Sequence, residues 1–344
     1  MEKRDIVIIG GGPSGAYCAV ELGKRGISST IINQWNKREK PCGGGITSLA
    51  MEKFPFIKKI YPHSKITKVY KIILMDNREK IFRGKKRFNI SRRILDKRII
   101  NMALKKGAEI INEKVIDLEY QKSHWKIKTD KRYISTRILV GADGINSIVR
   151  AKTIGSINIE NLGIACGYTV KGLEKEDITI KFVNGLKGYI WLFPRKFYSS
   201  IGIGSQFSDE DKRDQIQNMK HILDNFANKS NFPKIQIIRK SNYCAKFPFA
   251  TDYRFFDKKC VSAKQNWILI GDAAGHVDPI FGEGILYALW SGKIAAKAIA
   301  TEDVGWYQKK WQKEYGNHLK KQCKLKKDFY NPKFLNYFIL SQQN

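Results

Sequence analysis

Three glycine-rich segments carry residues whose spacing suits the binding of a large, partly anionic group. They cover residues 10–15, 141–150 and 271–285, and each follows a short apolar run. A glycine turn that leads into a helix leaves backbone N–H groups unpaired at the helix start, where they can hold an electron-rich group. The opening and closing segments therefore predict two halves of one site for a single long cofactor.

The opening segment lies in a predicted strand–helix–strand unit. Residues 5–9 predict a buried strand, residues 16–24 an amphipathic helix that Gly26 ends, and residues 29–32 a second strand. The pattern Gly-x-Gly-x-x-Gly in the first turn of such a unit permits a tight turn and a close approach to a pyrophosphate. Where such folds usually place an acidic residue for the ribose, this chain has Asn33, whose amide can still bond to a hydroxyl.

The closing segment places a carboxylate between a strand and a helix. Asp272 follows the apolar strand 267–270 and suits sugar-type hydroxyls, and a helix is predicted from Leu286 to Ala300. His276 stands alone in this segment, so we interpret it as structural rather than as an acid or base.

A second glycine loop covers residues 40–46, with the sequence Lys-Pro-Cys-Gly-Gly-Gly-Ile. Glycines after a turn-forming proline let the backbone pass close to a flat ring, because no Cβ stands in the way. The other interpretation is a flexible linker. Cys42 stands at the mouth of this loop, which makes its thiol a candidate group near a reacting centre.

An aromatic strand is predicted over residues 188–195, with the sequence Gly-Tyr-Ile-Trp-Leu-Phe-Pro-Arg. Alternation places its three aromatic side chains on one face and Ile190 and Leu192 on the other. A strand that is apolar on both faces either belongs to a core or lines an apolar cavity. Pro194 would end the strand. Arg195 would then either meet a phosphate at the cavity mouth or be a solvated surface arginine.

The remaining pattern is mostly that of strands. Residues 65–86 alternate and are basic, which predicts exposed strands outside the nucleotide-binding sheet, and residues 160–255 predict strands with one helix over 208–229. Ser91 is a candidate N-cap for a helix that runs to Lys105 and is followed by Gly107. The basic tail after residue 300 carries aromatic residues at helical spacing, so it either lies on an anionic membrane or, as we favour, packs on its own protein.

Composition limits the class of protein. With 344 residues and 42% hydrophobic content, the chain suits one large or two closely joined globular domains. No apolar run reaches the roughly 18–20 residues that a membrane-spanning helix needs, so we expect a soluble or peripheral cytoplasmic protein. We interpret the formal charge of +31 first as a solvated surface of biased composition, and second as a sign of contact with an anionic partner such as lipid. No nucleic-acid-binding motif surrounds the basic residues, and we expect no nucleic-acid partner.

The six cysteines lie far apart and form no Cys-x-x-Cys pair. We therefore expect no metal site and no disulfide framework, and we interpret all of them except Cys42 as small core residues.

The middle segment, Gly-Ala-Asp-Gly-x-x-Ser-x-Val-Arg over residues 141–150, completes a known fingerprint. Together with the opening Gly-x-Gly-x-x-Gly and the closing Gly-Asp-Ala-Ala-Gly, it resembles the FAD-dependent flavoproteins of the p-hydroxybenzoate hydroxylase-like superfamily. The Pro-Cys-Gly-Gly-Gly loop and the pattern Tyr-x-Trp-x-Phe-Pro resemble, more narrowly, the geranylgeranyl reductase family. The resemblance extends over about residues 3–300 and rests on these five motifs.

The resemblance implies an α/β fold in which an antiparallel β-sheet domain is inserted into a discontinuous Rossmann-type FAD-binding domain. The FAD-binding domain would comprise residues 1–65, 90–155 and 255–300. The substrate-binding β-sheet domain would comprise residues 66–89 and 156–254, and residues 301–344 would form a C-terminal helical region.

The resemblance also implies roles for individual residues. The residues predicted to bind FAD come from several motifs, and they are Gly10, Gly12, Ser14, Gly15, Asn33, Cys42, Gly43, Gly45, Arg92, Val115, Asp272, Gly284 and Ile285. The residues predicted to bind substrate are Tyr189, Trp191, Phe193, Pro194 and Arg195. The Gly284 and Ile285 amides would face the flavin where charge accumulates on reduction. Water and Cys42 are the candidate proton donors.

The function implied by the resemblance is saturation of carbon–carbon double bonds in a geranylgeranyl-type isoprenoid lipid or prenyl phosphate, by hydride transfer from reduced flavin. Two alternatives stay open. The first is a monooxygenase or halogenase of the same superfamily, and the second is a non-catalytic prenyl-binding protein. The external electron donor would be NAD(P)H or reduced ferredoxin, and an electron-donor protein is one expected partner. We expect a cytoplasmic enzyme, with peripheral contact to the inner face of an anionic membrane as an additional hypothesis.

Overall fold

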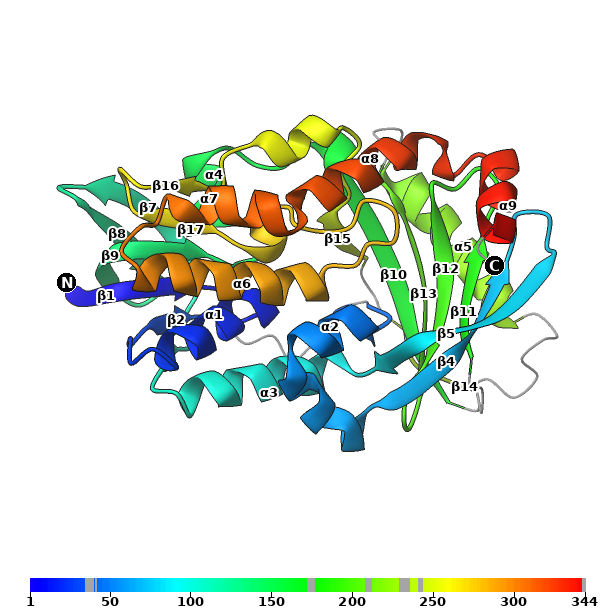
Figure 1. Cartoon of the computed structure of the whole chain (residues 1–344), viewed down its shortest axis with the longest axis horizontal. Helices are drawn as coiled ribbons and strands as arrows, with labels where there is room; N and C mark the ends of the chain where they lie inside the picture. The colour runs from blue at the N-terminus through cyan, green and yellow to red at the C-terminus, as the bar shows by residue number, and fades with distance from the viewer. Residues whose placement is uncertain are drawn as a thin grey trace. The chain divides into compact units, whose positions relative to one another are not determined.

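Strands in the computed structural model gather into two sheets, each in its own compact unit (Figure 1). The structure describes residues 1–34, 40, 42–171, 177–207, 212–228, 236–240 and 244–341. The first unit comprises Met1–Arg38, Leu95–Ile157 and Asp252–Cys323. The second unit comprises Glu39–Ile94, Asn158–Thr251 and Lys324–Asn344.

The first unit is built on a sheet with the strand order β16-β17-β9-β1-β2-β6, and β7 and β8 extend it beside β9. The pairs β1–β2, β1–β9, β9–β17 and β2–β6 are parallel. The buried apolar run at the end of β1 fits its central place, because a parallel strand that is covered on both faces is apolar along the covered part. The strands are β1 (Glu2–Ile9), β2 (Thr30–Ile32), β6 (Glu109–Ile111), β7 (Val115–Gln121), β8 (His124–Thr129), β9 (Tyr133–Gly141), β16 (Val261–Ser262) and β17 (Trp267–Leu269).

Two helices that follow glycine segments lie side by side in this unit, α1 (Pro13–Gly23) and α6 (Ile285–Ala300) (Figure 1). A Cβ at Gly292 of α6 would stand 2.5 Å from the carbonyl oxygen of Ser14, so the helices approach closely only because this position is glycine. Nearly all of α1 is buried, from Pro13 to Leu22. The predicted amphipathic character of this helix is therefore wrong, since α6 covers the side that we expected to face water.

The second unit is built on a sheet with the strand order β14-β10-β13-β12-β11-β4-β5-β3, with β15 also paired to β10. Most of its pairs are antiparallel, as the inserted domain was expected to be, but β4 and β11 pair in parallel. The strands are β3 (Gly45–Ile46), β4 (Lys65–Ile73), β5 (Glu79–Asn89), β10 (Leu162–Lys171), β11 (Ile178–Phe182), β12 (Gly188–Pro194), β13 (Ser199–Gln206), β14 (Gln236–Lys240) and β15 (Ala245–Pro248).

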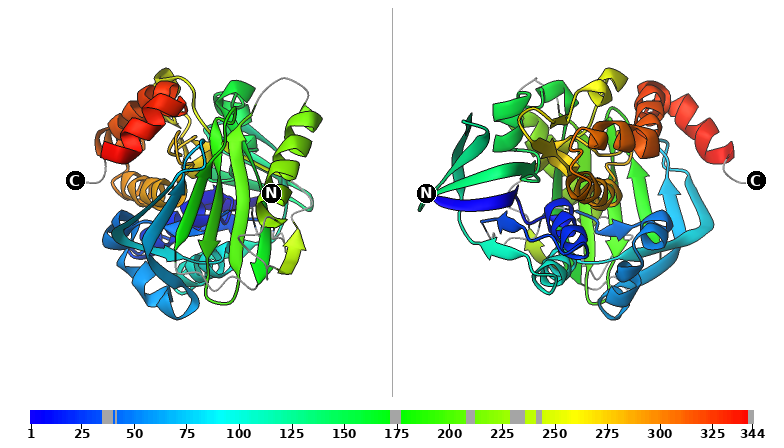
Figure 2. Two further views of the ribbon diagram at one scale, coloured as in Figure 1. Left: turned by 90° about the vertical axis from the view of Figure 1, so that its right-hand side faces the viewer. Right: turned by 60° about the vertical axis from the view of Figure 1, so that its left-hand side comes forward.

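Helices cover both faces of this second sheet, as Figure 2 shows for α5 (Lys212–Asn228) and α9 (Pro332–Ser341). Leu223 of α5 is fully buried, and so is Phe329, which lies just before α9 and packs edge-on against Phe182 of β11. The remaining helices are α2 (Ser48–Lys53), α3 (Arg92–Leu104), α4 (Ile148–Thr153), α7 (Trp306–Trp311) and α8 (Asn317–Phe329). No helix among the described residues combines the length and apolar character that crossing a membrane requires.

Three segments lie in other units than the expected domain boundaries gave them. One of them is residues 90–94, which include Arg92 and lie in the second unit. Residues 40 and 42–65 belong to the second unit rather than to the FAD-binding part, and within them β3 pairs with β5. The tail from residue 301 is divided between the units. Tyr307 and Trp311 are fully buried in the first unit, whereas the part after Lys324 packs in the second. These tail aromatics therefore pack on their own protein, as we favoured.

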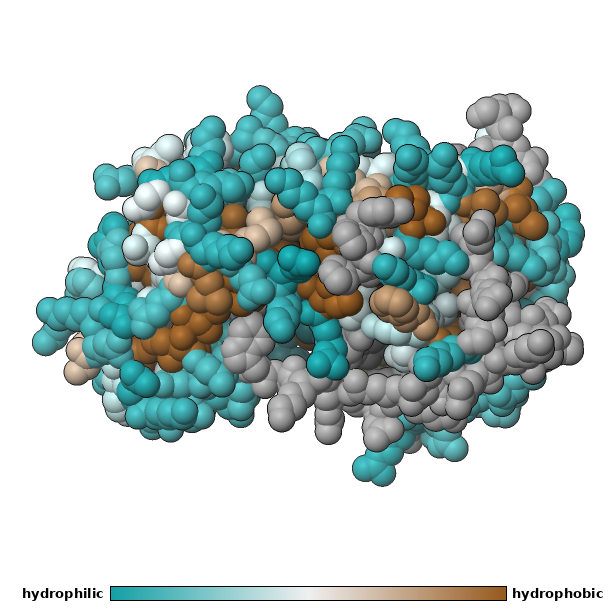
Figure 3. All heavy atoms as spheres, turned by 90° about the horizontal axis from the view of Figure 1, so that it is seen from below, coloured by the Kyte–Doolittle hydropathy of each residue, from teal (hydrophilic) through white to brown (hydrophobic). Residues whose placement is uncertain are grey.

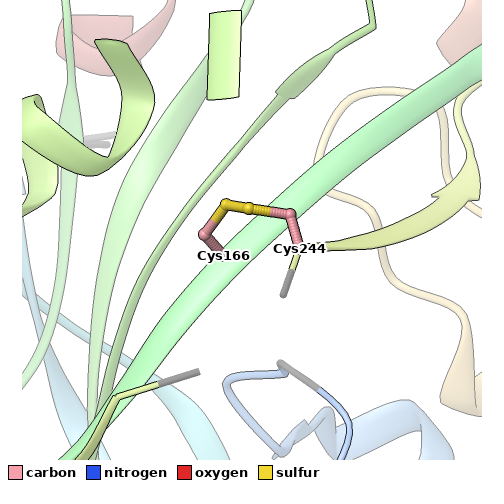
Figure 4. Close-up of a disulfide and its surroundings, with 2 residues drawn as sticks. All are labelled: Cys166 and Cys244. Atoms are coloured by element: carbon pink, nitrogen blue, oxygen red, sulfur yellow. A yellow bond between two sulfur atoms is a disulfide. The ribbon is translucent and has the colours of Figure 1, made fainter. Parts of the chain in front are cut away.

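A disulfide joins Cys166 of β10 to Cys244, which precedes β15 (Figure 4). The expectation that these two cysteines are free core residues is therefore wrong. The pair was not visible in the sequence because 78 residues separate the two cysteines. They become neighbours because β10 pairs with β15 in the register that sets Ala165 opposite Ala245, which places the next residues opposite each other at a Cα separation of 4.4 Å.

We expect the denatured protein to expose four thiols without reductant and six after reduction, because Cys18, Cys42, Cys260 and Cys323 are free. Reduction should also lower the free energy of unfolding by about 2–4 kcal/mol, since the bond closes a long loop in the unfolded chain. Thiol titration in denaturant and urea unfolding with and without reductant measure both. Six thiols in the unreduced protein would contradict the bond.

Candidate functional site

The opening and middle glycine segments touch through their backbones in the first unit. Gly10 has a φ of +106°, and a Cβ there would stand 2.3 Å from the carbonyl oxygen of Ala142. The Ala142 N–H donates to the carbonyl oxygen of Ile9 over 2.8 Å. Only glycine allows both the left-handed backbone and this approach. The contact joins the ends of β1 and β9 at the carboxyl edge of the sheet, where ligands of open α/β sheets bind.

The closing segment joins the same cluster. Gly271 has a φ of +58°, and a Cβ there would lie 2.7 Å from Oγ of Ser14. The Gly271 N–H donates to Oγ of Ser291 over 3.0 Å, which fixes the turn to α6. Buried Arg150, the last residue of the middle segment, donates from Nη1 to the carbonyl oxygen of Ala273 over 3.1 Å. All three glycine segments therefore meet.

The start of α1 leaves room for a ligand beside this cluster. Gly12 is the N-cap, and a Cβ built on it would meet no atom within 4 Å. No side chain caps this helix start in the part of the chain that the structure describes. An uncapped helix N-terminus with open space at its N-cap fits a pyrophosphate, because the first N–H groups and the helix dipole both favour an anion. The predicted residues Ser14 and Gly15 lie in this first turn.

The side chain of Asn33, which follows β2, supports the first glycine loop. Its Oδ1 accepts the N–H of Gly11 over 2.8 Å, and its own N–H donates to the carbonyl oxygen of Ile111. The oxygen of the amide is therefore used on the glycine loop. A ribose contact, which stays a prediction, can use the amide nitrogen or the second lone pair of Oδ1.

Asp272 lies beside the start of α6. A Cβ at Gly284, the N-cap of α6, would stand 3.4 Å from Oδ1 of Asp272. Ile285 is the first residue of the helix, and no side chain caps this end within the described ranges. A carboxylate and a helix start therefore lie together, an arrangement that can accept from a hydroxyl and donate to an electron-rich ring edge.

Two further predicted cofactor residues lie at element boundaries. Val115 opens β7 and is paired with Thr129 of β8 in the first unit. Arg92 opens α3, and Ser91 caps that helix by accepting the N–H of Arg93 over 3.2 Å, as expected. Their contacts with a cofactor stay predictions.

In the second unit, Arg195 and the Cys42 loop lie against each other. Nη2 of Arg195 donates to the carbonyl oxygens of Cys42, over 2.7 Å, and of Gly43, over 3.3 Å. Oγ of Ser200 donates to the same Cys42 oxygen over 3.1 Å. The alternative of a solvated surface arginine is wrong, since Arg195 is only 7% exposed. Its contacts with the loop also differ from the phosphate contact that we expected.

The Phe193 ring packs against the same loop. A Cβ at Gly43 would stand 2.5 Å from this ring, and a Cβ at Gly45 would stand 2.7 Å from it. Gly44 has a φ of +73°, and its carbonyl oxygen accepts the N–H of Ile90 over 2.9 Å. The flexible-linker interpretation is therefore wrong for residues 42–46. Pro41, next to them in the motif, lies outside the described residues.

The aromatic face of the second sheet combines buried and partly exposed side chains. Trp191 and Phe193 pack with Ala165 and Ile178, and partly buried Tyr189 extends the cluster. The Trp191 ring lies on the backbone of Gly202, where a Cβ would stand 2.0 Å from it. Pro194 is the last residue of β12, as expected. The strand is thus a core strand along most of its length, and only Tyr189 near its start is partly exposed.

His276 is enclosed by aromatic residues of the first unit. It is 1% exposed, its Nδ1 lies 2.9 Å from the hydroxyl of Tyr315, and its ring lies 4.2 Å from that of Trp311. Burial, with a smaller contribution from the charge of Arg150, lowers the pKa of His276 to about 3. A buried imidazole that stays neutral fits the structural role that we expected. The described residues contain no cluster of His, Cys, Asp and Glu that could hold a metal ion.

The buried His276 predicts a pH-dependent stability. Because its folded-state pKa of about 3 lies below the unfolded value of about 6.5, the unfolded state binds the extra proton between these pH values. The free energy of unfolding should therefore fall as the pH drops below about 6.5, by up to about 1.4 kcal/mol per pH unit from this group.

His276→Gln should remove this part of the slope, which urea unfolding between neutral and mildly acidic pH measures. His318→Gln, which replaces a solvent-exposed histidine, is the matched control. An unchanged slope in His276→Gln would contradict the assignment.

Comparison with known proteins places this geometry among flavoproteins. A family model for pyridine nucleotide-disulphide oxidoreductases matches residues 4–116. An uncharacterised protein of Methanosarcina barkeri is 31% identical and aligns with 96% of this chain and 84% of its own length. The digeranylgeranylglycerophospholipid reductase of Methanococcus vannielii is 27% identical, with coverage of 94% of this chain and 86% of its own.

A solved structure has the same fold. It is the crystal structure of a geranylgeranyl bacteriochlorophyll reductase-like protein from Thermoplasma acidophilum, with a TM-score of 0.83 and 21% identity. The match covers 96% of this chain and 88% of that protein. The α/β architecture with a Rossmann-type sheet, a second sheet and C-terminal helices is thereby confirmed.

Proposed function

The chain belongs to the geranylgeranyl reductase family of FAD-dependent oxidoreductases, and on this basis we propose that it saturates carbon–carbon double bonds of a geranylgeranyl-type isoprenoid lipid or prenyl phosphate. The observation that carries the proposal is the aromatic face of the second sheet. Trp191 and Phe193 are buried there with Ile178, and the partly buried Tyr189 and Ile180 extend this apolar cluster. A polyisoprenoid chain offers no hydrogen-bonding groups along its length, so apolar area must supply its binding energy.

The first unit would hold the cofactor by its backbone. Gly10, Gly12, Ser14 and Gly15 would receive the pyrophosphate at the start of α1, where the structure leaves open space. Asp272 would accept from a ribityl hydroxyl, and the N–H groups at the start of α6 would donate to the pyrimidine edge of the ring. Bound FAD, once reduced, supplies a hydride. Fixed donors at the ring edge favour the added charge without reorganising, which is what a preorganised site contributes.

The second carbon of the double bond must receive a proton. We propose Cys42 or a water molecule as its source. Cys42 is partly exposed in a loop whose backbone is fixed by Arg195 and Ser200, and its Sγ accepts the N–H of Gly44 over 3.3 Å. The position of the thiol is therefore defined, as a proton donor requires.

We propose two partners outside the chain. An external donor, NAD(P)H or reduced ferredoxin, would return electrons to the cofactor. The inner surface of an anionic membrane would supply the lipid, since the formal charge is +31 and lysine- and arginine-rich surfaces are attracted to anionic lipid. The face in Figure 3 shows mostly hydrophilic side chains with separate hydrophobic patches, which suits contact with a charged surface better than deep insertion.

Gly12→Ala should separate cofactor binding from folding. The backbone of Gly12 (φ −68°) suits any residue, and an added Cβ meets no protein atom within 4 Å, so the melting temperature should stay within about 2 °C. The same methyl group would obstruct the pyrophosphate and should weaken FAD binding at least about tenfold, or about 1.4 kcal/mol.

Flavin fluorescence titration and thermal unfolding without flavin measure the two effects of Gly12→Ala. Gly305→Ala, at another helical N-cap with room for a Cβ, is the matched control. Unchanged FAD affinity in Gly12→Ala would contradict the pyrophosphate assignment.

The activity itself is tested by anaerobic turnover. The purified flavoprotein, reduced with dithionite and given a geranylgeranyl lipid or geranylgeranyl diphosphate, should add one pair of hydrogens per double bond without oxygen. Mass spectrometry of the extracted lipid detects this gain. Turnover that requires oxygen and adds an oxygen or halogen atom would replace the proposal with a monooxygenase or halogenase, and protein that takes up no flavin would leave only prenyl binding.

A further inference from the structure

The carbonyl oxygen of Cys42 receives two hydrogen bonds from the end of the aromatic strand and its neighbour. One comes from Nη2 of Arg195, at 2.7 Å, and the other from Oγ of Ser200, at 3.1 Å. A carbonyl oxygen has two lone pairs, so both donors can be satisfied together. Arg195 and Ser200 are 7% and 6% exposed, so water competes little for either donor.

Trp191 determines which way the Ser200 hydroxyl donates. Its Nε1 donates to Oγ of Ser200 over 3.2 Å and therefore occupies an acceptor position of that oxygen. The indole has no acceptor, so the single hydroxyl proton remains available for the Cys42 oxygen. The bond from Ser200 to the loop thus has a fixed direction.

The guanidinium holds two successive peptides at once. Nη2 of Arg195 also lies 3.3 Å from the carbonyl oxygen of Gly43, and its Nε lies 3.4 Å from the same oxygen. The planar arginine fork can do this because its N–H groups are rigidly arranged, whereas an ammonium group is a single point charge. The Phe193 ring lies against Gly43 and Gly45 of the same segment. Polar and apolar contacts from one strand therefore hold one loop.

We propose that Arg195 and Ser200 are positioning residues that fix the peptides of Cys42 and Gly43. They determine where the Cys42 thiol stands and, in the holoenzyme, how this loop meets the flavin ring. The second half of this statement rests on the proposed function. Arg195 thus acts through the loop and not through a substrate phosphate.

Thiol labelling of the purified holoenzyme tests whether Arg195 and Ser200 fix the position of the Cys42 thiol. Cys42 is the one free cysteine of the described chain that is not buried, so a neutral maleimide should label it first under native conditions. In Arg195→Lys and in Ser200→Ala, a less constrained loop should raise the rate of labelling at Cys42 by about fivefold or more, as local opening becomes easier. Peptide mass spectrometry identifies the labelled residue.

Matched controls are available in the same unit. Ser205→Ala removes a hydroxyl from the same strand β13, where it donates to the carbonyl oxygen of Lys187 instead. Arg83→Lys changes an exposed arginine of β5. Both should label at the rate of the unaltered protein. Should Arg195→Lys fail to fold, Ser200→Ala decides alone, because it removes one oxygen and keeps the charge.

The visible absorption band of bound flavin tests whether Arg195 and Ser200 also determine how the loop meets the flavin ring. A merely structural defect would lower the stability of the protein without shifting this band. A shifted band with a lower kcat and an unchanged KM in both variants supports the proposal. Unchanged labelling and an unchanged band in folded variants overturn it, even if the enzyme reduces its lipid. If the protein binds no flavin but the variants still label faster, the proposed function fails while the positioning role stands.

Discussion

Close approach to the backbone at positions that lack a Cβ, by another backbone or by a side chain, is the constraint on which both units depend. In the first unit it joins Gly10 to Ala142, and it sets Gly271 against Ser14. In the second unit it lets Phe193 lie on Gly43 and Gly45 and Trp191 on Gly202. A methyl group at most of these positions would overlap atoms that have no space to move, so the glycines determine the distances between elements.

These contacts give the two glycine-rich regions different physical characters. At the start of α1 the backbone is closely packed at Gly10 and Gly15, whereas a Cβ at Gly12 would meet no atom within 4 Å. The space beside Gly12 is what a bound anion requires. The Cys42 loop is packed on the side of Phe193 and hydrogen-bonded to Arg195 and Ser200. One region provides room for a ligand, and the other provides a loop of fixed shape.

The local pattern of the sequence predicts what depends on near neighbours. The turn at Gly10, the cap at Ser91 and the strand that Pro194 ends all follow from a few adjacent residues. Long-range partners were not predictable, because the contact of Arg195 with Cys42 spans 153 residues and needs the register of the whole second sheet. The disulfide of Cys166 was missed for the same reason. The disulfide also bears on the expected cytoplasmic location of the protein, since disulfide bonds persist in oxidising compartments and in intracellular proteins of hyperthermophiles.

The interleaved order of the two units has a consequence for synthesis on the ribosome. Each unit collects three separate stretches, and the last stretch of the first unit runs to Cys323. Strand β17, which pairs with β9, is made more than a hundred residues after it. In a nascent chain, the edge of β9 that pairs with β17 therefore stays unpaired until most of the polypeptide has emerged. Chaperones that shield such an edge should matter more for this chain than for one whose domains follow each other in sequence.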